Sequence, residues 1–137
     1  MDVIHNQVNT NVQLSELEAG LVTLKNTEDA TMYLCPEATL LSVNENGILM
    51  ESMLSQASEM KTAICIFDVI GGKNPTETNY QQSVDRFRNK VGDDGLSYGT
   101  AYFPFVNTTV NSSYELDYTN FFGGDAFKLE AIINPSD

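Results

Sequence analysis

The feature that most constrains this fold is an unbroken apolar run near the middle of the chain. It spans residues 62–70, reads TAICIFDVI, and lacks the apolar–polar alternation of a half-exposed strand. Such a run is typical of a parallel strand that is covered on both faces. Gly71 and Gly72 end it. The run therefore predicts a central strand buried on both faces.

The segment after this strand has the period of a helix. Four apolar residues recur at intervals of four, three and four: Tyr80, Val84, Phe87 and Val91. A Gly-Asp-Asp-Gly turn at 92–95 leads into an aromatic run at 98–106, a second predicted strand that we also expect to be buried on both faces. Strand, helix and strand in this order predict a βαβ unit with a right-handed crossover.

Upstream of the central strand, the chain predicts a short amphipathic helix and another strand. Leucines recur with helical spacing over residues 14–24, and Ser15 with Glu18 has the spacing of a capping box. Residues 30–35 predict a strand, which Pro36 closes. Both elements would pack beside the βαβ unit.

A further helix is predicted between these two strands. Residues 44–47 (NENG) are polar and predict a turn, and residues 49–60 place apolar side chains on one helical face. The order helix, strand, helix, strand, helix, strand then predicts an α/β fold. Its sheet would be small and mainly parallel, built from consecutive βαβ units and flanked by helices.

The length and the pattern together predict one domain. The chain has 137 residues, enough to bury most of its apolar surface. We expect a flexible lead-in over residues 1–13, the α/β domain over 14–110, and a weakly structured tail over 111–137. Within that tail, residues 127–133 alternate as an edge strand would.

Charge and hydropathy exclude two classes of partner. The 19 acidic residues against 7 basic ones give a net charge of −12, which would repel a phosphate backbone. No apolar stretch is long enough to cross a bilayer, and the N-terminus lacks the pattern of a signal peptide. We therefore expect a soluble, cytoplasmic domain that binds no nucleic acid and does not insert into a membrane.

The Gly-Gly-Lys loop at 71–73 invites comparison with a phosphate-binding loop, because it follows a strand and precedes a helix. That motif needs an earlier glycine, which is missing here, and a hydroxyl residue after the lysine, where Asn74 and Pro75 stand. The loop instead predicts a helix start, with Asn74 as its cap, Pro75 at the first position and Glu77 as the partner in a capping box.

The remaining chemistry-bearing residues do not form a set. Asp68 ends the central strand, and with Lys73 it is the best candidate if the chain is an enzyme. The single histidine, His5, lies in the lead-in and has no partner in the predicted core. Cys35 and Cys65 are predicted to be free thiols in the two strands, without further metal ligands at suitable spacing. We expect no catalytic, cofactor-binding or metal-binding residues.

Three segments, in this order, resemble the conserved region of contractile tail sheath proteins of bacteriophages and phage-tail-like injection particles. They are MYLCPEATLL at 32–41, AICIFDVIGG at 63–72 and YGTAYFPFV at 98–106. The family pattern is an apolar strand ending in Asp-Val/Ile-Pro, then a helix, then Gly-Ala-x-Tyr-Tyr/Phe-Pro-Trp. Ile70 stands where proline is common and Phe105 where tryptophan is common. The resemblance spans roughly residues 28 to 110.

This resemblance implies a structural protein and not an enzyme. Sheath protomers form hexameric rings stacked around an inner tube, and terminal arms add strands to neighbouring protomers. Contraction drives the tube through a target membrane. The implied partners are other sheath protomers and the inner tube protein, without a cofactor. The implied location is cytoplasmic assembly and then the virion tail or the particle. A sheath domain without its terminal arms, such as this chain would be, is expected to be a monomer or weak dimer.

Two other classes of function stay open, because a fold does not determine a function. One is a stand-alone α/β binding or adaptor domain. The other is a flavodoxin-like or hydrolase-like enzyme that lacks a recognisable active site.

Overall fold

Helices and strands alternate along the part of the chain that the computed structural model describes, residues 11–27, 29–73, 75–76, 79–106 and 108. The elements are α1 (Leu14–Thr23), β1 (Met32–Leu34), α2 (Val43–Met60), β2 (Ile64–Asp68), α3 (Tyr80–Lys90) and β3 (Gly99–Tyr102). Short 3-10 turns occupy Leu24–Asn26, Pro36–Leu40 and Leu96–Tyr98. This order confirms the predicted alternation. All of these elements belong to the first of two units of the chain, residues 1–105.

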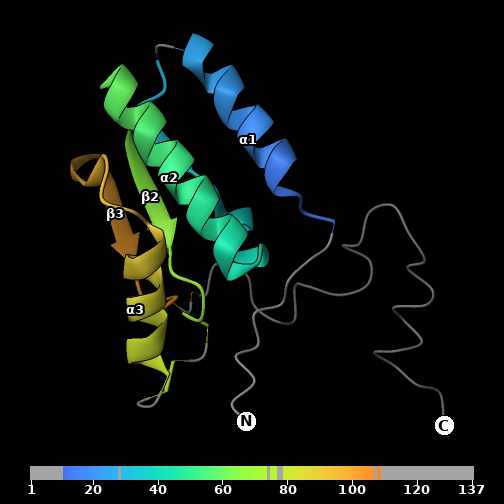
Figure 1. Ribbon diagram of the computed structural model, residues 1–137, viewed down its shortest axis with the longest axis vertical. Helices are drawn as coiled ribbons and strands as arrows, with labels where there is room; N and C mark the ends of the chain where they lie inside the picture. The colour runs from blue at the N-terminus through green and yellow to red at the C-terminus, as the bar shows by residue number, and fades with distance from the viewer. Residues whose placement is uncertain (1–10, 28, 74, 77–78, 107, 109–137) are drawn as a thin grey trace, which may run out of the picture. The chain divides into compact units, whose positions relative to one another are not determined.

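The three strands of the described residues form one parallel sheet in the order β1-β2-β3. β2 is central, and α2 crosses it (Figure 1). The register pairs Leu34 with Ile66 and Ile66 with Thr100, so these side chains lie on the same face. The predicted small α/β fold with a parallel sheet is confirmed.

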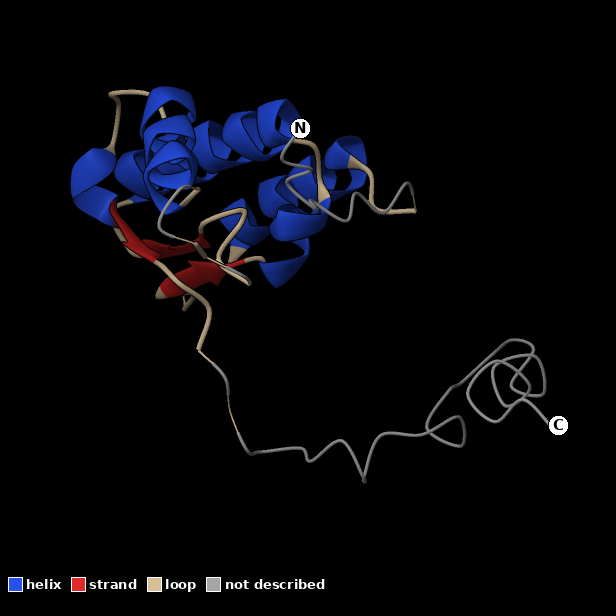
Figure 2. Cartoon of the chain, turned by 90° about the horizontal axis from the view of Figure 1, so that it is seen from below, coloured by secondary structure: helices blue, strands red, loops and turns tan. Residues whose placement is uncertain are grey.

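The sheet has one covered face and one open face. Strand order follows chain order, and right-handed crossovers then require both connecting helices to lie on the same side. Figure 2 shows α2 and α3 on that side. There, Tyr33, Cys65 and Phe67 are buried, whereas their neighbours Met32 and Ile64 are 63% and 48% exposed. The prediction that the central strand is buried on both faces is therefore wrong for the described residues.

The second predicted strand is also shorter and less buried than expected. β3 ends at Tyr102, which is 61% exposed, and Phe103 beyond it is half-buried. Pro104 has no N–H to donate to a ladder, so the strand cannot continue through it. The predicted burial of residues 98–106 on both faces is wrong because β3 is an edge strand of a sheet with one open face.

α2 begins six residues earlier than predicted, and the expected turn at 44–47 is part of the helix. Ser42 is the N-cap: its hydroxyl accepts from the Glu45 N–H (3.3 Å), and the Glu45 carboxylate accepts from the Ser42 N–H (3.1 Å). The Ser42 hydroxyl also donates to the Glu45 carboxylate (2.6 Å), and this hydrogen bond, together with the one from the Ser42 N–H, lowers the pKa of Glu45. Asn46 stays inside the helix because its side chain is buried and donates to the Ala38 carbonyl (2.8 Å).

The N-cap of α1 differs from the predicted one, and α3 begins later in the chain than predicted. α1 has Gln13 as its N-cap, so the capping box expected at Ser15 is wrong. α3 begins at Tyr80, and two reciprocal hydrogen bonds between Thr76 and Asn79 lie directly before it. The Asn79 Oδ1 accepts from the Thr76 N–H (2.7 Å), and the Thr76 Oγ1 accepts from the Asn79 N–H (3.3 Å). The expected caps Asn74 and Glu77 lie outside the described residues.

A single buried amide ties three elements together. The Nε2 of Gln56 in α2 donates to the Leu21 carbonyl in α1 (2.8 Å) and to the Tyr33 hydroxyl in β1 (3.3 Å). Gln56 is 4% exposed and Tyr33 is 2% exposed. Because a buried polar group without a partner is costly, these bonds align α1 and β1 with α2.

Replacing Gln56 with alanine should lower the free energy of unfolding by about 1–3 kcal/mol, because the Leu21 carbonyl and the Tyr33 hydroxyl lose a buried donor. Urea denaturation measures this. Gln82→Ala on the exposed face of α3 is the control and should change stability by less than about 0.5 kcal/mol. Equal effects of the two variants would contradict the role of this amide.

Candidate functional site

In the glycine loop after β2, the backbone N–H and C=O of Gly72 both form hydrogen bonds within the chain. The Gly72 N–H donates to the Val69 carbonyl (3.1 Å), and the Gly72 carbonyl accepts from the Phe105 N–H (2.9 Å). A Cβ on Gly72 would lie 2.7 Å from the Phe105 ring, and Gly71 has a φ of 95°. The two glycines therefore allow Phe105 to pack against the loop. This use of the Gly72 amide supports the sequence-based argument against a phosphate-binding loop.

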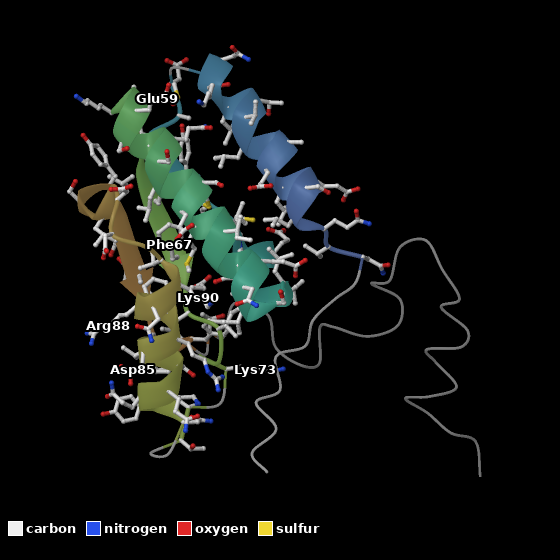
Figure 3. All side chains as sticks on the ribbon, viewed as in Figure 1. Glu59, Phe67, Lys73, Asp85, Arg88 and Lys90 are labelled. Carbon is white, nitrogen blue, oxygen red and sulfur yellow. The ribbon has the colours of Figure 1, made fainter. Side chains whose placement is uncertain are left out.

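The two candidate enzyme residues do not come together. Asp68 ends β2 beside Tyr102 and is half-buried, whereas Lys73 is exposed on the loop. Figure 3 shows the Lys73 side chain extending away from the sheet. The one salt bridge among the described residues is elsewhere, between Lys25 and Glu59 (2.8 Å). His5 lies outside the described residues.

The two cysteines are free thiols, as predicted. Cys65 is fully buried on the covered face of β2, and burial raises its pKa to about 11. Cys35 follows β1 and is half-buried; burial is the main cause of its raised pKa, and Glu37 also contributes. A raised pKa disfavours the thiolate, so neither residue has the character of a nucleophile.

Two hollows occur among the described residues, and neither contains a catalytic pair. An apolar hollow of about 180 Å³ adjoins the free edge of β3. It is lined by Leu54, Phe67, Phe87, Val91, Leu96, Gly99, Thr100 and Ala101. A smaller one lies where α3 meets the first turn of α2 and includes Asn46, Ser83, Arg86 and Lys90. No group of three or more His, Cys, Asp or Glu residues in the described part could hold a metal ion.

The described part of the fold also exposes apolar side chains on the sheet. We use the term open sheet face for the exposed apolar side chains on the uncovered side of the sheet, which are Met32, Leu34, Ile64 and Tyr102. Each of the four is between 48% and 63% exposed. The outer edges of β1 and β3 also have no strand partner among the described residues. Large exposed apolar patches and unpaired strand edges are general features through which protein chains associate.

Sequence reasoning missed the open sheet face, because the first four residues of β2 are all apolar and their sequence does not show which of them are covered. Comparison of the chain with protein-family models, with curated proteins and with solved structures gave no match.

Within the described residues, no helix has both the length and the apolar character needed to cross a membrane.

Substitutions at the adjacent residues Gly72 and Lys73 test this interpretation of the glycine loop. Gly72→Ala should lower the free energy of unfolding by about 1–3 kcal/mol, because the added methyl group overlaps the Phe105 ring. Lys73→Ala, one residue further on, should change it by less than about 0.5 kcal/mol, since that side chain is exposed. Lys73-dependent binding of ATP in a thermal-shift assay would contradict this interpretation of the loop.

Thiol labelling tests the state of the cysteines. In a Cys35→Ser variant, Cys65 should react with a thiol reagent at pH 8 only as fast as the protein unfolds, because the sulfur is buried and its pKa is raised. The same variant in urea should react at once. Rapid labelling of the folded variant would show that the covered face of β2 is accessible.

Proposed function

We propose that this chain is the central domain of a contractile tail sheath protomer, whose function is to assemble around an inner tube and contract. The observation that carries the proposal is the placement of the three resembling segments. Segment 32–41 contains β1, segment 63–72 contains β2, and segment 98–106 contains β3. These three strands are neighbours in one sheet. The three resembling segments therefore belong to one packed sheet and are not scattered over the structure.

Packing between the segments supports the proposal further. A Cβ on Gly99 would lie 2.7 Å from Leu54 and 3.2 Å from the Phe67 ring, so the glycine lets β3 approach the core. Phe105, at the position where tryptophan is common in the family, packs on Gly72 of the preceding segment. The motif residues therefore contact one another across the segments.

The surfaces of the domain favour assembly over catalysis. The open sheet face and the two free strand edges offer apolar and backbone contacts to another chain. The acidic and basic candidates, Asp68 and Lys73, do not converge on either hollow of the described residues. In this proposal the partners are other protomers and the inner tube protein. Assembly takes place in the cytoplasm, and the product is a virion tail or a related particle.

Electron microscopy tests this function directly. The complete protein encoded by the reading frame that contains this chain should form long tubes, because neighbouring protomers are linked through strand exchange. The 137-residue chain alone should remain a monomer or weak dimer. A complete protein that stays monomeric at every concentration would refute the sheath assignment and leave an adaptor domain as the better explanation.

A further inference from the structure

The chain leaves the sheet through a short exposed segment, residues 104–106, which we call the strap. The ladder between β2 and β3 cannot hold it. The Val69 N–H donates to the Tyr102 carbonyl (3.4 Å), so the backbone groups of Tyr102 face β2. Because these groups alternate in direction along a strand, those of Phe103 face the free edge of β3. Pro104 has no N–H to donate.

One backbone hydrogen bond ties the strap to the rest of the described residues. The Phe105 N–H donates to the Gly72 carbonyl in the glycine loop after β2 (2.9 Å). The Phe105 ring packs on the same residue, where a Cβ would lie 2.7 Å from the ring Cδ1 and 2.9 Å from Cε1. Since both contacts are made to Gly72, we expect them to form and break together.

The glycine loop under the strap has contacts of its own. Gly72 is buried, and its N–H donates to the Val69 carbonyl (3.1 Å). On the other side, a Cβ on Gly71 would lie 2.5 Å from the Oγ of Ser83 in α3, a residue that is 5% exposed. The loop is therefore packed against β2 and α3 without the help of the strap.

The strap itself contributes little to the core. Phe105 is 38% exposed and Val106 is 84% exposed, whereas Phe67 in the central strand is 6% exposed. A segment with few buried contacts opens locally at a lower free energy than the whole domain unfolds. The contacts of the strap thus place it at the low end of the stability range of this domain.

We infer that the strap is a conformational device that opens from Gly72 and closes on it while the sheet stays folded. Phe103, which is half-buried and directly follows β3, is the hinge. In the closed state Phe105 fixes the direction in which the chain leaves the domain, and in the open state that direction is free. The inference goes beyond the proposed function and does not depend on it, because it follows from contacts within this chain.

Hydrogen exchange followed by NMR tests whether the strap opens separately from the sheet. The Thr100 amide is the reference, because Thr100 directs its backbone groups toward β2 as Tyr102 does. The Phe105 amide should be protected at least about a hundredfold less than the Thr100 amide. Low concentrations of urea should hardly change its exchange, since the opening exposes little surface. Equal protection and equal urea dependence of the two amides would overturn the inference.

A pair of neighbouring substitutions tests what closes the strap. Phe105→Ala removes the ring, so the amide of residue 105 should exchange near its intrinsic rate while the Thr100 amide stays protected at least about a hundredfold. Val106→Ala is the matched control and should leave both amides unchanged, because that side chain is 84% exposed. If Phe105→Ala abolishes the protection of Thr100, or leaves that of residue 105 intact, the strap is not a separate device.

A distance measurement tests the change of direction. Spin labels are attached at Ser55→Cys, on an exposed position of α2, and at Val106→Cys, in a Cys35→Ser background where the remaining Cys65 is buried. Double electron–electron resonance should give one narrow distance distribution with Phe105 in place and a broad one with Phe105→Ala. Narrow distributions in both would show that the strap does not move, and broad ones in both that Gly72 does not hold it. Either result overturns the inference.

Discussion

The packing of α2 against the covered face of β2 is the contact on which the rest of the domain depends. α2 buries five apolar side chains against the sheet and its neighbours: Leu49, Met50, Met53, Leu54 and Ala57. β2 supplies Cys65 and Phe67 from the opposite side. Burial of this extent is the main favourable term in folding. α1 and α3 then contact α2, while β1 and β3 pair with β2, so every other described α-helix and strand is placed by one of these two.

Much of the architecture could be predicted from spacing alone. Helical periods and apolar runs place six elements in the right order, and strands that alternate with helices along the chain favour a parallel sheet. Helix boundaries were harder to predict, because they depend on tertiary contacts. The NENG segment looks like a turn, yet Asn46 finds a buried acceptor in Ala38, and Gly47 allows Lys90 to approach. A residue's helical propensity does not report such partners.

The open sheet face shows why an exposed apolar surface is less predictable from sequence than a core. Residues 62–70 are apolar at nearly every position, so their sequence does not distinguish the face under α2 from the other one. The distinction comes from strand order: three strands in chain order with right-handed crossovers place both connecting helices on one face and leave the second face without a helix among the described residues. That face nevertheless keeps Met32, Leu34 and Ile64. Apolar residues retained on both faces are consistent with a strand that acquires a second covering layer from elsewhere.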